Sequence, residues 1–295
     1  MYDIIVIGAG PSGMTAALYG LRANKSVLVL ESISHGGQII NASNIENYPG
    51  IINISGFDYA NNLYNQVIDL GGVFKYENVV SIDSNKKIIT NKNEYEAKTI
   101  IIATGCKNRK LNLDSEDKFI GHGISYCAMC DGNFYKDKVV CVVGGGNTAL
   151  EDALYLSNIA SKVYLIHRRD KFRGDNKYVE EVKSKSNIEI ILNASLNSLN
   201  GDLSVSSVDL LVDGNIKSLS VDGVFVAIGQ IPNSDFLKNI IDLDDNGYIN
   251  SSDCHTNIKG IYVAGDVRSK NVRQLTTAVS DGTISATLAV NEMEE

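Results

Sequence analysis

One segment of this sequence occurs twice, at an offset of 136 residues. Residues 4–19 read IIVIGAGPSGMTAALY, and residues 140–155 read VCVVGGGNTALEDALY. Each copy is an apolar run, a glycine-rich turn and a helix-compatible stretch, followed by a second apolar run at residues 26–30 or 162–166. This order predicts two β-α-β units. Because their strands are almost continuously apolar, they should lie in parallel sheets covered on both faces.

Further β-rich segments follow each copy. Residues 98–105 (KTIIIATG) and 222–229 (DGVFVAIG) are expected strands, and hairpin-like segments precede them at 79–95 and 188–217. A last strand at 260–266 leads to a helix at 274–291. A chain of 295 residues suggests two domains, at one per ~150 residues. We therefore expect an α/β fold with two Rossmann-like dinucleotide-binding domains.

The first glycine fingerprint is Gly8-x-Gly10-x-x-Gly13, between an expected strand and an expected helix. Its glycines permit a tight turn and a close approach of the backbone to a pyrophosphate at the helix N-terminus. Glu31 ends the second strand 23 residues after Gly8, where a carboxylate can accept hydrogen bonds from a ribose 2′-hydroxyl. This pattern predicts a dinucleotide with a free ribose. The alternative is a glycine turn in an ordinary α/β sheet.

The second fingerprint, GGGNTA at residues 144–149, lacks the carboxylate. His167 stands where Glu31 stands in the first copy, and it is followed by Arg168, Arg169 and Arg173. Guanidinium groups bind phosphate with charge-assisted hydrogen bonds. The second site is therefore predicted to bind NADP(H), the alternative being that these arginines form a solvated surface.

A pair of cysteines precedes the second copy, in the order Cys127-Ala128-Met129-Cys130-Asp131. This spacing lets the two sulfurs cycle between a disulfide and a dithiol, and Asp131 could exchange protons with them. Zinc is one alternative, with Cys254 and His255 as the candidate partners. A structural cysteine pair is another, and Asp131 could be an ordinary turn or cap residue. No metal site is predicted, and the other three of the five cysteines are expected to be small buried side chains.

Composition excludes several classes of function. Lys and Arg number 27 against 35 Asp and Glu, so the net charge of −8 disfavours nucleic acid or an anionic membrane as the main partner. No apolar run reaches the ~18 residues of a membrane helix. Residues 1–3 lead directly into a strand-like stretch without a basic leader, so we expect a cytoplasmic protein.

Two dinucleotide sites and a redox dithiol together predict a path for electrons. They would pass from NADPH through a second cofactor to a disulfide. A flavin accepts two electrons at once, so FAD is the economical occupant of the first site.

The whole chain resembles the low-molecular-weight, bacterial-type thioredoxin reductases, which are flavin-dependent pyridine nucleotide-disulfide oxidoreductases. The motifs that carry the resemblance are GAGPSG (8–13), GGQ (36–38), ENYPG (46–50), ATG (103–105), CAMCDG (127–132), GGGNTA (144–149), HRRDKFR (167–173), AGDV (264–267) and RQL (273–275). The chain departs from the common pattern at Met129, Leu275 and Gly174, where relatives often have Thr, Ala and Ala.

The resemblance also implies residue roles. For FAD it implies Gly8, Gly10, Pro11, Ser12, Gly13, Glu31, Ser32, Gly37, Gln38, Asn47, Val79, Ala103, Thr104, Gly105, Gly265, Asp266, Arg273, Gln274 and Leu275. For NADPH it implies Gly144, Gly146, Asn147, Thr148, His167, Arg168, Arg169 and Arg173. Cys127 and Cys130 would form the active disulfide, with Cys127 attacking the substrate disulfide and Asp131 assisting proton transfer.

The resemblance implies a nested domain map and a homodimer. FAD would bind a three-layer ββα domain made of residues 1–108 and 239–295, into which an NADPH domain at 109–238 is inserted. Thioredoxin would be the disulfide substrate, and the inserted domain would rotate between half-reactions about hinges near 107–112 and 236–240. Alternatives are a related reductase or dithiol oxidase with another protein or small-molecule acceptor, and a flavoprotein sensor that does not turn over. The arginines count against an oxidase, and against relatives that take electrons from ferredoxin.

Overall fold

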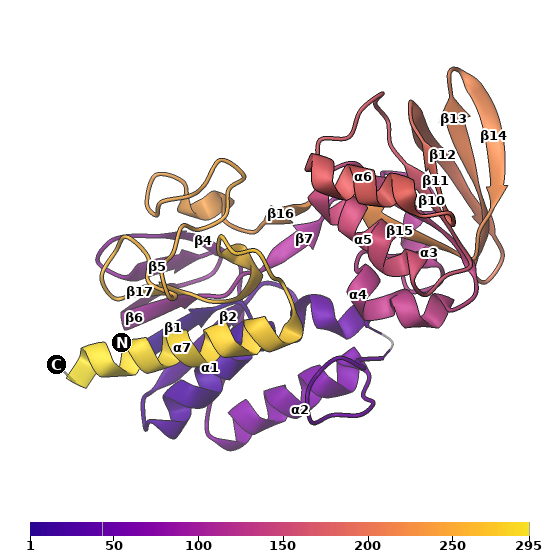
Figure 1. The fold of residues 1–295 in the computed structure, drawn as a ribbon. Helices are drawn as coiled ribbons and strands as arrows, with labels where there is room; N and C mark the ends of the chain where they lie inside the picture. The colour runs from indigo at the N-terminus through magenta and orange to yellow at the C-terminus, as the bar shows by residue number, and fades with distance from the viewer. Residues whose placement is uncertain (43, 295) are drawn as a thin grey trace. The chain divides into compact units, whose positions relative to one another are not determined.

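The computed structural model describes residues 1–42 and 44–294, which form two compact units. Unit 1 consists of Met1–Lys107 and Ile231–Glu295, and unit 2 is the inserted segment Asn108–Gln230. Each unit contains a parallel sheet with helices on one face and antiparallel strands on the other (Figure 1). The predicted fold class, two Rossmann-like units with one inserted into the other, is confirmed.

Unit 1 is built on a sheet in the order β3-β2-β1-β6-β5-β4, with β17 also paired to β6. The elements of its sheet and covering layers are β1 (Tyr2–Ile7), α1 (Pro11–Arg22), β2 (Val27–Glu31), η1 (Gly37–Asn41), α2 (Gly56–Asp69), β3 (Val73–Tyr76), β4 (Val79–Ile82), β5 (Lys87–Thr90), β6 (Glu94–Ile102), η3 (Asp235–Leu237), β17 (Ile261–Val263), η4 (Gly265–Val267) and α7 (Leu275–Glu294).

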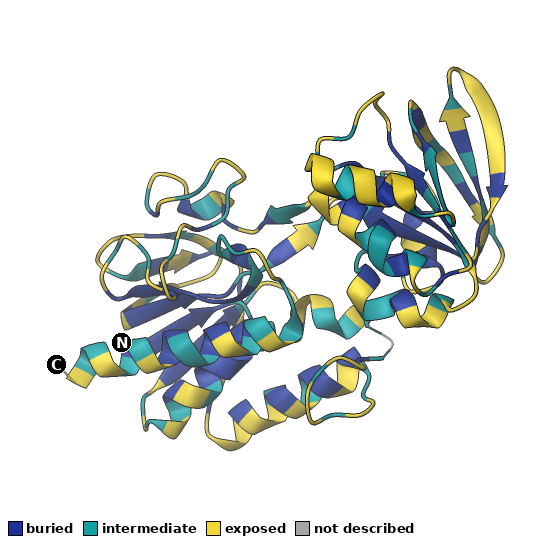
Figure 2. Cartoon of the chain, in the orientation of Figure 1, coloured by how far each residue is buried: buried dark blue, intermediate teal, exposed yellow. Residues whose placement is uncertain are grey.

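The long strand β6 explains why unit 1 has three layers. Its first half pairs antiparallel with β5, and its second half pairs parallel with β1 and β17. Alternate residues of β1 therefore enter two cores. Ile4 and Val6 pack with the helices, whereas Ile5 and Ile7 pack with the antiparallel strands and the segment around Leu237. In Figure 2 these central strands are dark blue, which marks them as buried.

The last strand and helix belong to unit 1, as the resemblance implies. Ile261 pairs with Ile100, and α7 lies alongside α1 (Figure 1). Gly282 permits this close packing, because a Cβ there would lie 2.3 Å from the carbonyl oxygen of Ser12. Chain segments from both ends of the sequence thus meet beside the first glycine loop.

Unit 2 repeats this plan around a parallel sheet in the order β11-β10-β9-β15-β8. Helices α5 and α6 pack on one face, and the antiparallel sheet β12-β13-β14 packs on the other. Its elements are α3 (Glu116–Phe119), β8 (Ile124–Ser125), α4 (Ala128–Asp131), η2 (Gly132–Tyr135), β9 (Val139–Gly144), α5 (Asn147–Ser157), β10 (Lys162–Ile166), α6 (Asn176–Ser184), β11 (Ile188–Ile191), β12 (Ala194–Gly201), β13 (Val205–Val212), β14 (Asn215–Ser220) and β15 (Gly223–Ala227).

The prediction for one segment of unit 2 was partly wrong. Residues 188–217 were expected to be hairpin-like, but β11 at its start is an edge strand of the main sheet, with Val163 of β10 paired parallel to Ile188. Only β12, β13 and β14 are antiparallel. A short apolar run cannot by itself indicate the direction of its partner strand.

The second domain boundary also lies earlier than predicted. Residues 231–238, which the sequence assigned to the inserted domain, are part of unit 1. The side chains of Thr104 and Asn233 bond to each other's backbone carbonyls, at 2.7 and 2.9 Å, and Leu237 is fully buried in the core of unit 1. The two crossing segments, β7 (Cys106–Asn108) and β16 (Gln230–Pro232), pair as a two-stranded sheet.

Across the described residues, no helix is both long and apolar enough to cross a membrane.

Candidate active site

A disulfide joins Cys127 and Cys130 at the first turn of α4, with 5.3 Å between their Cα atoms. The backbone N–H of Cys130 donates to Sγ of Cys127 at 3.2 Å. Met129, between the two cysteines, is 56% exposed, whereas Ala128 is buried against α5. No group of three or more metal-ligating side chains gathers anywhere in residues 1–42 and 44–294.

Asp131 lies at the end of α4 and is linked through Ser125 to the backbone of Cys127. The Ser125 hydroxyl donates to Oδ2 of Asp131 at 2.6 Å and accepts from the backbone N–H of Cys127 at 3.0 Å. Burial raises the pKa of Asp131, and the hydrogen bond from Ser125 opposes part of that rise. Asp131 is therefore an acid with a raised pKa, one hydrogen-bonded residue away from the backbone of Cys127.

The first glycine loop leaves the N-terminus of α1 open. Gly8 has φ +106°, and a Cβ there would lie 2.4 Å from the carbonyl oxygen of Ala103. By contrast, a Cβ on Gly10 would meet nothing within 4 Å, and no side chain caps the helix. Pro11 occupies the first turn of α1, where a missing N–H costs no helical hydrogen bond. Free backbone N–H groups thus face an open position, as a pyrophosphate site requires.

The remaining residues predicted for FAD all lie in unit 1. Most follow the carboxyl ends of β1, β2, β6 and β17, the edge where parallel α/β sheets bind ligands. The exceptions are placed at η1, the loop before α2, β4 and the start of α7. Side-chain contacts join several of them: Asn47 Nδ2 donates to Oε1 of Gln274 at 3.2 Å, and Arg273 Nε donates to the carbonyl of Asp266 at 3.2 Å. Gln38 Nε2 donates to the carbonyl of the neighbouring Cys106 at 3.0 Å.

The two acidic residues predicted at this edge make different contacts within the chain. Glu31 holds the loops around the site, because its carboxylate accepts from the backbone N–H groups of Ala9 and Ser32 at 2.9 and 2.7 Å. Asp266 has a buried Oδ1 without a hydrogen-bond partner within the described chain, although Lys270 Nζ lies 3.5 Å away. A ligand hydroxyl would satisfy this oxygen.

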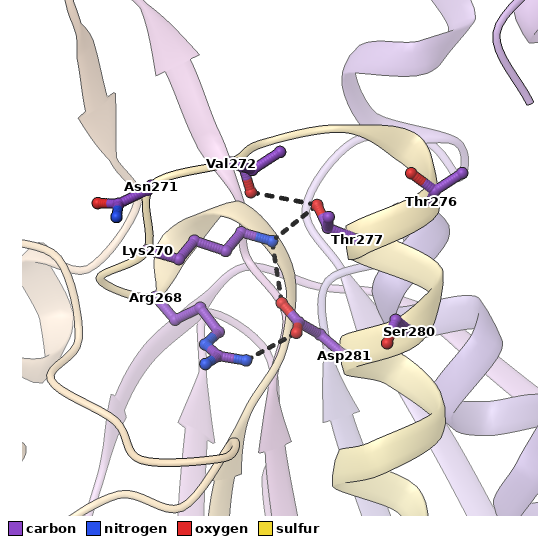
Figure 3. Close-up of a pocket in the computed structure, with 8 residues that line it drawn as sticks. All are labelled: Arg268, Lys270, Asn271, Val272, Thr276, Thr277, Ser280 and Asp281. Carbon is purple, nitrogen blue, oxygen red and sulfur yellow. Dashed lines mark hydrogen bonds and ion pairs between the residues drawn. The ribbon is translucent and has the colours of Figure 1, made fainter.

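A buried ion cluster that the sequence did not reveal supports Asp266. Asp281 of α7 is 6% exposed and accepts from Arg268 at 2.7 Å, from Lys270 at 2.9 Å and from the backbone N–H of Gly265 at 3.1 Å. Figure 3 shows both cations reaching Asp281. Arg268, Lys270 and Asp281 are among the residues that line a pocket of about 460 Å³. Asp281 therefore anchors the turn that carries Asp266 to helix α7.

Replacing Asp281 by alanine should lower the free energy of unfolding by about 3–5 kcal/mol, because it leaves two largely buried cations without their shared carboxylate. The loss is measured by urea denaturation followed by far-ultraviolet circular dichroism.

Asp235 provides the control, because its ion pair with Lys238 is exposed on both sides. Asp235→Ala should cost less than about 1 kcal/mol. Equal losses for the two variants would contradict the role assigned to Asp281.

The second glycine loop has the same open geometry in unit 2. A Cβ on Gly146 would meet nothing within 4 Å, and no side chain caps α5. The arginine loop is tied to it, because the backbone N–H of Arg173 donates to the carbonyl of Gly145 at 2.7 Å. The side chains of Arg168, Arg169 and Arg173 are exposed. The backbone of the arginine loop is thus fastened to the glycine loop, and its three arginine side chains are exposed to solvent.

His167 is placed differently from the arginines that follow it. The residue is 5% exposed, and Nε2 lies 3.1 Å from the carbonyl oxygen of Lys171 within the same loop. Burial lowers the pKa of His167, and the nearby arginines lower it further. A Cβ on Gly145 would lie 2.2 Å from the ring. His167 thus supports the loop from inside.

Position 174, where relatives often have alanine, is glycine in this chain for a steric reason. A Cβ there would lie 2.5 Å from Cδ1 of Leu150 and 2.8 Å from Oδ1 of Asn147. The same Asn147 oxygen accepts from the backbone N–H of Asp175 at 2.7 Å. The predicted nucleotide residue Asn147 therefore fastens the arginine loop to the start of α5, and alanine at 174 would disturb that contact.

The sequence missed several residues that shape the disulfide site. Glu116 is almost fully buried; its carboxylate accepts from the Tyr126 hydroxyl at 2.7 Å and from the backbone N–H of Leu111 at 2.8 Å. It thus joins the residue before Cys127 to the start of the inserted segment. Ser125 was missed as well. Neither residue belongs to a pattern with a fixed spacing, so only the fold reveals them.

Comparisons with known proteins identify the family and support the fold. Residues 2–282 match the family model "Pyridine nucleotide-disulphide oxidoreductase". A thioredoxin reductase of Mycoplasma genitalium is 43% identical over 300 residues, covering 99% of this chain and 95% of the relative. The crystal structure of thioredoxin reductase from Streptococcus pyogenes has 37% identity and a TM-score of 0.93, covering 100% of this chain and 98% of that one. The structure of thioredoxin reductase from Giardia duodenalis has 34% identity and a TM-score of 0.94, covering 100% of this chain and 99% of that one.

Proposed function

Because this chain belongs to the thioredoxin reductases of the pyridine nucleotide-disulphide oxidoreductase family, we propose that it reduces the disulfide of a thioredoxin with electrons from NADPH. It is an oxidoreductase, and its family implies a flavin and a pyridine nucleotide. The observation that carries the proposal is the Cys127–Cys130 disulfide with Asp131 linked to its backbone through Ser125. An ordinary structural disulfide needs no half-buried acid linked to its backbone.

The flavin would be FAD, bound in unit 1. The open N-terminus of α1 would take its pyrophosphate, and Glu31 would accept from the ribose. Oδ1 of Asp266, which makes no hydrogen bond within the described chain, would accept a hydroxyl. In unit 2, Arg168, Arg169 and Arg173 support a choice of NADPH over NADH, because they can bind the extra 2′-phosphate. When bound, these two groups supply an electron pair and deliver it to the disulfide.

The chain's own residues would then perform two thiol steps. Breaking the Cys127–Cys130 bond takes up two electrons and two protons and leaves two thiols. The Cys127 thiolate attacks one sulfur of the thioredoxin disulfide and expels the other. Cys130 then attacks Cys127 Sγ, which restores the intramolecular disulfide and releases the reduced thioredoxin.

Asp131 would exchange a proton with the thiols as they form and react. The attacking role of Cys127 is supported by the N–H of Cys130, since a hydrogen bond donated to sulfur favours the thiolate. Met129 is exposed between the two cysteines, where an incoming protein would meet it.

Rotation of one unit against the other would resolve a conflict between these steps. The arginine loop and the disulfide both belong to unit 2, whereas the proposed flavin site belongs to unit 1. Hydride transfer and thiol attack each need reacting atoms about 3–3.5 Å apart, so the two sites of unit 2 would take turns at the flavin. The hinges would lie at the boundaries between the two units, 107–108 and 230–231.

The test is a turnover assay of the FAD-loaded protein with NADPH and an oxidised thioredoxin, repeated with NADH. We expect thioredoxin thiols to form stoichiometrically with NADPH consumption, and NADH to be a poor substitute. No thioredoxin reduction would overturn the proposed substrate, and equal use of NADH would overturn the role of the arginines.

A homodimer and a cytoplasmic location remain predictions from the resemblance and the sequence. The dimer is checked by light scattering of the purified protein, which should give about twice the monomer mass of 32.0 kDa. A monomeric mass would contradict it.

A further inference from the structure

The Ser125 hydroxyl lies at the centre of three groups beside the redox disulfide. It is 2.6 Å from Oδ2 of Asp131, 3.0 Å from the backbone nitrogen of Cys127 and 3.3 Å from the Cys127 carbonyl oxygen. Ser125 ends the edge strand β8 and is 4% exposed. Because it is shielded from solvent, its hydrogen bonds must be made within the protein.

A serine hydroxyl has one hydrogen to donate and two lone pairs that accept. When Asp131 is charged, the hydrogen points to Oδ2 and the N–H of Cys127 donates to Oγ. When Asp131 is protonated, its own O–H can donate to Oγ, and the serine hydrogen can turn to the Cys127 carbonyl. Oγ then accepts two hydrogen bonds and donates one. Both protonation states of Asp131 are therefore satisfied without movement of the backbone.

We propose that Ser125 is a positioning residue that keeps Asp131 hydrogen-bonded in both of its protonation states and so lets it take up and release a proton in every cycle. This inference rests on the proposed function, because the proton-transfer role of Asp131 belongs to that function. The hydrogen bond itself is independent of the substrate, so it can be tested without turnover.

Other titratable groups lie on the elements next to Asp131, and their titrations must be distinguished from that of Asp131. Tyr135 of η2 follows α4 directly, and burial raises its pKa to about 12, with Asp131 and Asp222 adding to the rise. Helix α5, which packs against α4, carries Asp152 and Tyr155. Burial raises the pKa of Asp152 to about 7, with Glu151 adding to the rise, so its titration could be mistaken for that of Asp131.

The test is the pKa of Asp131 in the oxidised holoprotein, measured by NMR with carboxyl-labelled aspartate. The signal is assigned by its absence in Asp131→Asn. In Ser125→Ala the pKa should rise by about one pH unit, because a hydrogen bond donated to the charged carboxylate is lost. An unchanged pKa in a folded Ser125→Ala protein would overturn the inference.

Three variants serve as controls. Tyr126→Phe removes the neighbouring hydroxyl bond to Glu116 and should leave the pKa of Asp131 unchanged. Ser125→Thr keeps a hydroxyl and should restore the wild-type value. Asp152→Asn should leave the assigned signal in place. A shift in Tyr126→Phe as large as in Ser125→Ala would mean that general loosening of the segment is responsible, and would count against Ser125.

A second measurement needs no change at Ser125. The amide proton of Cys127 should titrate in the wild type with the same midpoint as Asp131, because protonation of Asp131 alters the bonds of the hydroxyl that this amide contacts. In Asp131→Asn that titration should vanish. An amide that does not titrate in the wild type would overturn the inference even if Ser125→Ala failed to fold.

The pH profile of turnover separates the inference from the proposed function. If Ser125→Ala raises the pKa of Asp131 and moves the pH profile upward with it, both stand. If the pKa rises and the profile does not move, Ser125 still positions Asp131, and the proton-transfer role of Asp131 fails.

Discussion

Replacing Cys130 by serine is expected to abolish reduction of a protein disulfide while leaving binding of both cofactors intact. Serine has no thiol, so Cys127 has no partner with which to form the intramolecular disulfide again. The enzyme therefore cannot begin a second turnover. We expect steady-state thioredoxin reduction to fall at least ~1000-fold, as when one member of a catalytic unit is removed. Stopped-flow absorbance of the flavin would show that NADPH still reduces it, and a thiol reporter would show that thioredoxin is not reduced.

Cys141 is the matched control for this variant. Its thiol lies at the centre of the unit 2 sheet, and burial raises its pKa far above the ordinary value, so it is inert as a nucleophile. Cys141→Ala should therefore keep its turnover. Continuous thioredoxin reduction by Cys130→Ser would refute the assignment of the disulfide as the electron carrier.

Removing the three arginines of the second site is expected to change the choice of nucleotide. In a protein carrying Arg168→Ala, Arg169→Ala and Arg173→Ala, we expect KM for NADPH to rise about 100-fold or more, because several charge-assisted bonds to the 2′-phosphate are lost. KM for NADH should change little, since NADH has no such phosphate. Steady-state kinetics with both nucleotides measures the ratio of KM for NADPH to KM for NADH.

A control must remove the same charge elsewhere in unit 2. Lys177, Lys183 and Lys185 lie on and just beyond α6, and their replacement by alanine also removes three positive charges. This variant should keep the preference for NADPH. A similar loss of preference in both triple variants would show that overall charge, rather than the position of the arginines, selects the nucleotide.

Much of the fold could be predicted because its signals are local. The two glycine loops each lie between a strand and a helix, and their spacing alone predicted the two Rossmann-like units. The prediction was weaker where strand pairing matters. Nothing in the apolar run at β11 distinguishes a hairpin strand from a parallel edge strand, and the contacts that hold Asn233 in unit 1 involve Thr104, a residue remote in sequence.

The candidate site divides in the same way. Cys127, Cys130 and Asp131 could be found because short spacing is itself the chemical signal. Ser125 could not be found in this way, because its role depends on the turn that brings Asp131 within hydrogen-bond distance of it. Asp281 and Arg268 could not be paired either, because their contact joins a helix to a loop and has no sequence pattern.

The internal repeat was thus sufficient to predict the number and type of the domains. The CAMCD segment was sufficient to predict the kind of chemistry. Both depend on residues close together in the chain, whose geometry follows from local backbone rules. The tertiary structure alone decided how each acid is held: Asp131 by the Ser125 hydroxyl, and the turn of Asp266 by Asp281 with its two cations. These groups matter only when folding buries them, because a buried polar atom needs a partner within the protein and the fold determines which one is near.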